Sequence, residues 1–224
     1  MTAASARQLP GGTGPAAPGQ APLARPRPTR LIHLHLASRR VPSALAAVAA
    51  CGVVLRIALH WHWIDSTGPG AQELPVMIEA ATAAVIAVVT ASPFGEPERA
   101  TGRWLPYLRL ADALGLALAA VAALAAGAAA AGLDDGTLGI LRNVAGLDGI
   151  GLLSAAVAGG GLAWIGPLAY AVVADFGLVE GWTTPWIWPG RPPHDLGGAL
   201  CAGLAFTAGL AVITVRGARD SLRD

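Results

Sequence analysis

Long apolar stretches separated by short polar segments make up the chain from residue 41 onward. Six of these stretches reach or approach the roughly 20 mostly apolar residues that a membrane-spanning helix needs. We therefore predict an all-α, polytopic integral membrane protein with six transmembrane helices. The expected spans are residues 41–61, 74–93, 108–133, 139–158, 161–178 and 197–215.

The fourth and fifth expected spans form one continuous apolar block. Three consecutive glycines, Gly159, Gly160 and Gly161, interrupt it. Glycine is the residue best suited to a tight change of direction. We therefore divide the block at this triplet.

Composition supports the membrane assignment. The 224 residues are 54% hydrophobic and only 13% charged, whereas soluble domains carry about 25% charged residues. All 15 basic residues are arginines. Because a P-loop requires a lysine that reaches the nucleotide phosphates, this chain is not a conventional P-loop ATPase, and any ATP-driven role needs a partner chain.

The two cysteines, Cys51 and Cys201, both lie in apolar stretches. This excludes a disulfide framework and gives no indication of a metal cluster. We expect two buried, unreactive thiols.

The first 28 residues consist mainly of proline, glycine and alanine with scattered arginines. Such a composition cannot bury a core. We predict a disordered cytoplasmic tail over residues 1–28, followed by one transmembrane domain over residues 29–224.

The segment "TRLIHLHLASRR", residues 29–40, precedes the first span. Its apolar and polar side chains fall on opposite sides of a helical wheel, which predicts a short amphipathic helix lying on the inner leaflet. A metal site is a weaker interpretation of the two histidines, because no third ligand lies nearby. Leu31 and Leu34 mark the apolar face, and His33, His35 and Arg39 mark the polar face.

Arginines concentrate on one side of the expected topology. Six precede the first span, three lie between the second and third spans, and three follow the last span. Only Arg142 and Arg191 fall on the other side, and Arg56 lies inside the first span. Since positive residues accumulate in cytoplasmic segments, we expect a multi-pass cell-membrane protein with both termini cytoplasmic.

Arg56 and Glu79 are ionisable residues inside the first and second expected spans. They lie at similar depths below the outer ends of two consecutive helices. A charge at that depth is costly unless it is paired or hydrated. We predict an intramembrane ion pair that fixes the two helices; a place on a substrate pathway is the alternative.

Residues 179–195 combine four prolines with three tryptophans, Trp182, Trp186 and Trp188. The prolines exclude a long regular helix, and tryptophan favours the membrane interface. We predict an outer aromatic segment that dips into the outer leaflet and is buried against protein.

The sequence gives only weak indications of a metal site or of catalysis. His60, His62, Asp65 and His194 could converge on a metal ion, but the tryptophans among them favour an interfacial anchor, and we expect no metal site. Ser154 is the one serine deep in a span and has no histidine at comparable depth. Hydrolase motifs are also missing from the sequence, so we do not expect an enzyme.

Between the second and third spans lies "SPFGEPERATGRWLPYLRL", a segment rich in both signs of charge. In this segment, and in the segments "LRNVAGLDGIGLL" and "GGGLAWIGPLAY", the chain resembles the membrane subunit of ABC-2-type ABC transporters, particularly small actinobacterial permeases. The resemblance covers roughly residues 29–224. It also rests on the topology, with cytoplasmic ends and an elaborated outer segment between spans five and six.

This resemblance implies a permease subunit, and its direction of transport is expected to be export. ATP would bind and be hydrolysed on a separate ABC ATPase subunit, so no cofactor is expected on this chain. The permease would form a homodimer, or a heterodimer with a similar permease, in the lipid bilayer, and nucleic acid is not an expected partner. The loop that couples to the ATPase would comprise Glu96, Glu98, Arg99, Arg103 and Trp104.

Two alternatives to this interpretation remain. The charged loop could be a solvated connection that only follows the positive-inside rule. The whole chain could be a stand-alone membrane protein with a sensing, scaffolding or assembly role and no transport.

Overall fold

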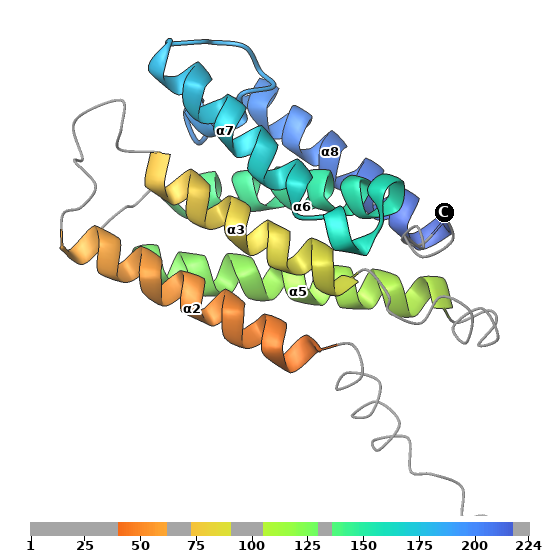
Figure 1. The fold of residues 1–224 in the computed structure, drawn as a ribbon. Helices are drawn as coiled ribbons and strands as arrows, with labels where there is room; N and C mark the ends of the chain where they lie inside the picture. Colours follow the sequence, from red (N-terminus) through yellow and green to blue (C-terminus); the bar gives the residue numbers. More distant parts are fainter. Residues whose placement is uncertain (1–39, 62–72, 91–104, 130–135, 217–224) are drawn as a thin grey trace, which may run out of the picture.

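The computed structural model describes residues 40–61, 73–90, 105–129 and 136–216. Six long helices run alternately in opposite directions and form one bundle (Figure 1). The described residues contain six helical stretches long and apolar enough to cross a membrane, the fifth of them running from Gly160 to Val179 and so including the short turn before α7, and they contain no strand. The all-helical prediction and the number of candidate spans are thus confirmed. The helices are α2 (Val41–His60), α3 (Glu73–Thr90), α5 (Leu105–Ala129), α6 (Gly136–Ala158), α7 (Ile165–Val179) and α8 (Leu196–Arg216).

Helices α3 and α6 form the centre of the bundle. Helix α3 contacts α2 and α7, helix α6 contacts α5 and α8, and the two central helices pack against each other. Accordingly 56% of the α3 span and 61% of the α6 span are buried, against 22% for α8. Polar groups on the inner faces of α3 and α6 are therefore surrounded by protein.

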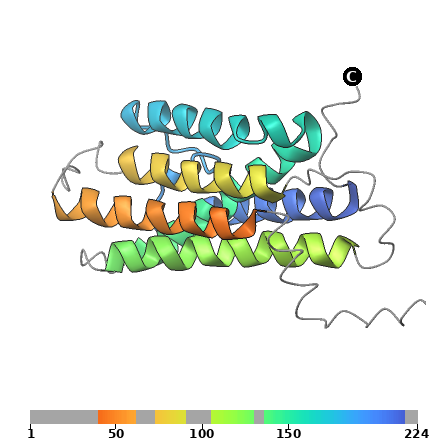
Figure 2. The same ribbon diagram turned by 60° about the horizontal axis from the view of Figure 1, so that its bottom comes forward.

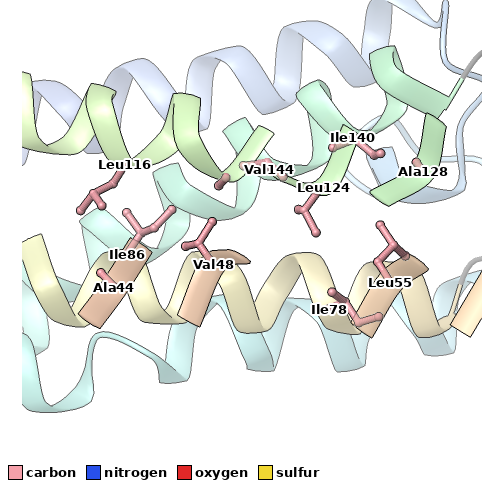
Figure 3. Packing of buried hydrophobic residues seen from close by; sticks show 11 residues of the cluster. Ala44, Val48, Leu55, Ile78, Ile86, Leu116, Leu124, Ala128, Ile140 and Val144 are labelled. Atoms are coloured by element: carbon pink, nitrogen blue, oxygen red, sulfur yellow. The ribbon is translucent and has the colours of Figure 1, made fainter. Parts of the chain in front are cut away.

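One apolar cluster ties four of the helices together. Figure 3 shows Val48 and Leu55 of α2 facing Leu124 of α5, with Ile86 of α3 and Val144 of α6 beside them. Each of these side chains is buried. The cluster fixes the rotation of α2 about its own axis, and this rotation decides where its polar residues point.

Glycines allow two pairs of helices to approach closely. A Cβ atom on Gly52 of α2 would lie 2.5 Å from the Ala123 carbonyl oxygen of α5, and one on Gly127 would lie 2.5 Å from the Gly52 oxygen. On the other side of the bundle, Gly149 of α6 and Gly209 of α8 face each other in the same way. Small residues at such crossings are a common basis of helix association in membranes.

The chain changes direction at the glycine triplet, as the sequence indicates. Helix α6 ends at Ala158, and Gly159 has φ 86°, a conformation that favours glycine. A short 3-10 helix, η3 (Gly160–Leu162), leads into α7.

Three helix starts differ from the prediction by more than one residue: α6 begins at Gly136, three residues earlier than expected, α7 begins at Ile165, four residues later, and α5 also begins early. The expected third span covers residues 108–133, but α5 begins three residues earlier, at Leu105. Pro106 does not prevent this, because proline is tolerated in the first turn of a helix.

The two ends of the bundle differ in which helix termini they contain. Figures 1 and 2 place the starts of α2, α5 and α7 and the ends of α3, α6 and α8 at one end. We call it the Arg40 end, after the residue that precedes α2. The opposite end contains the segment between α7 and α8.

Several predicted features lie outside the described residues. These are the tail over residues 1–28, most of the interfacial helix, the whole charged loop between α3 and α5, and two of the four residues considered for a metal site. By residue they are Leu31, His33, Leu34, His35, Arg39, His62, Asp65, Glu96, Glu98, Arg99, Arg103 and Trp104.

Candidate functional site

Four charged or amide side chains are buried in the two central helices. Glu79 of α3 is 2% exposed, and Arg142, Asn143 and Asp148 of α6 are 7%, 7% and 1% exposed. Buried polar groups are costly unless they form hydrogen bonds. Three of the four form a connected network at the end of the bundle opposite Arg40.

Asn143 joins the two central helices. Its amide Nδ2 donates a 3.0 Å hydrogen bond to the Glu79 Oε2 atom. Its Oδ1 atom accepts a 3.4 Å hydrogen bond from Nε of Arg142. The side chain of Asn143 therefore lies between a carboxyl group and a guanidinium group and contacts both.

Arg142 binds the segment that connects α7 to α8. Its Nη1 atom donates to the Pro192 carbonyl oxygen at 2.7 Å, and its Nη2 atom donates to the Arg191 carbonyl oxygen at 3.0 Å. These carbonyls belong to residues 180–195, which we call the cap segment. One guanidinium group thus ties the cap segment to the central helix.

The predicted ion pair between Arg56 and Glu79 is not formed. Arg56 is exposed on the surface of α2, and Glu79 is hydrogen-bonded to Asn143 instead. The rotation of α2 explains the difference, since Leu55 and Gly52 face the bundle and leave the adjacent Arg56 outside. The basic group near Glu79 is Arg142, which the sequence analysis placed on the outer side without a partner.

The cap segment begins at a well-defined helix end. Gly181 has φ 69°, its N–H donates to the Leu178 oxygen at 3.2 Å, and the Trp182 N–H donates to the Gly177 oxygen at 2.8 Å. This pair of bonds is a Schellman motif, which satisfies the last carbonyls of a helix. It turns the chain sharply back toward the bundle.

The middle of the cap segment is inserted between α6, α7 and α8. Here the 3-10 helix η4 (Trp188–Gly190) contacts all three helices. Trp188 is 4% exposed and stacks on Tyr170 of α7 with ring centroids 4.4 Å apart. A Cβ on Gly146 of α6 would meet the indole ring of Trp188 at 2.5 Å, so this position must be glycine for the ring to fit.

The outer aromatic segment is therefore buried against protein at Trp188 but not at the other two tryptophans. Trp182 and Trp186 are 42% and 43% exposed. The Trp186 carbonyl nevertheless accepts a 2.7 Å hydrogen bond from the Tyr170 hydroxyl. The exposed rings suit an interfacial position, in line with the composition of the segment.

An acidic residue secures the end of the cap segment. Asp195 Oδ1 pairs with Arg191 Nη2 at 2.9 Å, and its Oδ2 accepts the Gly198 N–H at 2.7 Å. The second bond makes Asp195 the N-cap of α8. The Arg191 Nη1 atom also donates to the Thr183 oxygen at 2.9 Å, which closes the cap segment on itself.

These contacts affect the charge states of Asp195 and Arg191. The hydrogen bond from Arg191, and then that from the Gly198 N–H, lower the pKa of Asp195 below its ordinary value of 3.8. The same carboxylate raises the pKa of Arg191. Both groups therefore carry their charges at neutral pH, where the contact is complete.

Acid is expected to loosen the cap segment, at a pH that depends on Arg191. Because the pKa of Asp195 is lowered, the stability that it contributes is complete above pH 3.8 and is lost as the pH falls through the lowered value. The substitution Arg191→Gln removes the main cause of the lowered Asp195 pKa, so loosening should begin at higher pH. Tryptophan fluorescence during acid titration in detergent measures this. Asp195→Asn is the control without a titrating group, and equal midpoints for wild type and Arg191→Gln would contradict the assignment.

The fourth buried group, Asp148, stands apart from the network. Neither of its carboxyl oxygens has a hydrogen-bond partner within the described part of the chain. It lies one turn beyond Val144, in the middle of α6.

Sequence reasoning missed Arg142, Asn143, Asp148 and Asp195 as site residues. Asp195 could have been found, because an aspartate directly before an apolar helix is a frequent N-cap. Arg142 and Asn143 stand six and seven residues after the start of α6. They could have been noticed because they are polar residues inside an expected span.

No metal-binding group is evident where the chain is described, since no three His, Cys, Asp or Glu side chains gather there. His60 and His194 belong to the described residues. Cys51 and Cys201 are free, half-buried thiols.

Comparison with known proteins gives no match: no protein-family model, no curated protein and no solved structure is detectably similar to this chain.

Proposed function

We propose that the chain is the membrane-spanning permease subunit of an ABC transporter of the ABC-2 type, with ATP hydrolysed on a separate subunit. The observation that carries the proposal is the bundle of six apolar helices with a mixed-charge connection between its second and third members. An ATPase that moves on binding ATP needs a specific contact on the permease, and charges of both signs provide specificity and register.

The distribution of charge supports a cytoplasmic position for the Arg40 end. Of the described residues, Arg40 precedes α2, Arg109 lies in the second turn of α5 and Arg216 ends α8, so all three lie at this end, against one acid, Asp112. This is the pattern of the positive-inside rule. The coupling loop joins α3 to α5 at the same end, so it faces the side where ATP is available.

Arg142 and Arg191 at the opposite end are both held by contacts within the protein. Arg142 is bound by backbone carbonyls near Glu79, and Arg191 is paired with Asp195. They therefore add little free positive charge to the outer side. In the proposed orientation, the cap segment lies outside the cell membrane and both chain termini lie inside.

Export fits the small size of the outer connections. The cap segment has 16 residues from 180 to 195 and is inserted into the bundle by Trp188. Importers of this kind of architecture would need a docking surface for a substrate-delivering protein. Since α3 and α6 pack directly against each other in the centre, the proposed pathway lies between two copies or between two similar permeases.

Charge reversal in the loop tests the coupling role. The triple variant Glu96→Arg, Glu98→Arg, Arg99→Glu should insert normally, because the loop does not enter lipid in the proposed topology. It should lose ABC ATPase in a detergent pull-down from the native host's membranes, with the ATPase identified by mass spectrometry, since like charges would then oppose each other across the contact.

Glu180→Arg is the matched control for that experiment, because Glu180 is exposed at the opposite end. It should retain the ATPase. Recovery of the ATPase at the wild-type level by the triple variant, at moderate salt, would refute the coupling loop. Absence of any ABC ATPase from the wild-type pull-down would favour the stand-alone sensing, scaffolding or assembly role. High salt is avoided, because it screens surface charges.

A further inference from the structure

Asp148 occupies an unusual position for a carboxyl group. It stands twelve residues after the start and ten before the end of α6, the most buried of the candidate spans. At 1.5 Å per residue, it lies roughly at mid-depth of a bilayer. Its side chain is 1% exposed, so neither lipid headgroups nor bulk water reach it.

The surroundings of Asp148 on α6 are apolar and tightly packed. Gly149 lies against the α8 backbone, and Gly151 lies against Ala87 of α3. Leu152, one turn further, packs in a cluster with Ala113 of α5 and Ile213 of α8. The neighbouring helices thus present alkyl groups and backbone close to this part of α6.

None of the described titratable groups on the helices that pack against α6 supplies a partner for Asp148. Both of its oxygens lack a hydrogen bond, whereas Glu79 has Asn143 and Tyr170 has the Trp186 carbonyl. The groups concerned are Glu73 and Glu79 of α3, Tyr107, Arg109 and Asp112 of α5, Tyr170 and Asp175 of α7, and Cys201 and Arg216 of α8.

An ionised carboxylate in such surroundings is strongly unfavourable, because it has lost its hydration and gained no counter-charge. A bound ligand must remove that cost. A metal cation needs several oxygen ligands, and no group of three candidate ligands occurs within the described ranges. A proton needs only the carboxylate itself.

We propose that Asp148 is a proton-binding site in the middle of the membrane domain. A lone pair of the carboxylate forms an O–H bond with the proton, and the product is a neutral carboxylic acid. The bundle already accommodates such donors: the hydroxyls of Thr82, Ser154 and Thr214 each donate to the carbonyl four residues earlier, at 2.8, 2.9 and 2.8 Å. The O–H of a protonated Asp148 is a donor of the same kind. The site does not depend on the proposed transport role.

Infrared spectroscopy of the purified full-length chain in lipid tests the proposal. A neutral carboxylic acid has a C=O band separate from all carboxylate bands. At neutral pH we expect this band in the wild type, shifted when the protein carries aspartate labelled with a heavy carbon isotope in the carboxyl group. It should vanish in Asp148→Asn and persist in Asp175→Asn and Glu79→Gln.

Each possible outcome supports or overturns the assignment of Asp148 as a proton-binding site. Absence of an aspartate-dependent acid band in the wild type would overturn the proposal, and a carboxylate band that shifts with added Na⁺ would replace it by a cation site. An acid band that shifts with the aspartate label and survives in Asp148→Asn would also overturn it. If Asp148→Asn fails to fold, isotope-labelled Asp112→Asn and Asp175→Asn variants still assign the band by elimination, because these two and Asp148 are the aspartates within the described helices. No ATPase is needed, so failure here is distinct from failure of the permease proposal.

Discussion

Replacement of Arg142 by Met should destabilise the protein by about 3–5 kcal/mol, the usual cost of removing one partner from a buried charged network. The substitution removes the donors to the Pro192 and Arg191 carbonyls and leaves the Glu79 carboxyl with Asn143 alone. Unfolding in detergent, followed by circular dichroism, measures the loss. In a chain of this length we expect a fall in Tm on the order of 10 °C.

Arg56→Met is the matched control for this experiment. Arg56 also lies inside a span, but it is exposed and takes no part in the network. Its replacement should change the free energy of unfolding by less than about 0.5 kcal/mol. Equal losses for the two variants would contradict the assignment of Arg142 as the cation of the site.

Glu79→Gln extends the comparison to a double-mutant cycle. If Arg142 supports the Glu79 carboxyl through Asn143, the second substitution should recover part of the loss caused by Arg142→Met, because it removes the unsupported acid. Combined with Arg56→Met, Glu79→Gln should give additive effects. Non-additivity with Arg56 instead would restore the pairing expected from the sequence.

The positions of the helices could be predicted from the sequence because the length of an apolar run directly reflects the thickness that it must cross. The division at Gly159 was also predictable, because a φ of 86° is a property that glycine provides locally. Both features are encoded within a few consecutive residues. Neither requires knowledge of which helices are neighbours.

The partner of Glu79 could not be predicted in the same way. Depth along a helix is readable from the sequence, and Arg56 matches Glu79 in depth. Rotation about the helix axis cannot be read from the sequence, because it depends on the contacts of Gly52 and Leu55 with α5 and the rest of the core. The close approach at Gly127 turns Arg56 outward, and a helix distant in sequence, α6, supplies Asn143 instead.

The same limit applies to the tryptophans of the cap segment. Their enrichment next to prolines predicted a segment that is partly buried, but not which ring is inserted. A glycine on α6, Gly146, provides the space for the Trp188 indole, and Tyr170 provides the stacking surface. Tertiary contacts between distant residues therefore decide the details of the site.

Replacement of Gly149 by Leu should destabilise the protein by about 3 kcal/mol or more, the upper part of the range for overpacking a tight core. A Cβ at this position would collide with the backbone of Ala205 and Phe206 in α8, and backbone atoms cannot rotate away as a side chain can. In a bilayer, close packing contributes much of the attraction between helices, so forcing α6 and α8 apart removes contacts without a compensating gain. Unfolding in detergent measures the effect.

Gly139→Leu is the control on the same helix, because no atom lies within 4 Å of a Cβ placed there. It should be nearly neutral, since leucine also favours the helix more than glycine does. Gly209→Leu on α8 should resemble Gly149→Leu, because its Cβ would lie 2.9 Å from the Gly149 Cα atom. Since both glycines serve one crossing, the double variant should lose less than the sum of the single losses, as one separation of the helices relieves both collisions. Fully additive losses would show that the crossing tolerates each side chain independently and would contradict the close contact between α6 and α8.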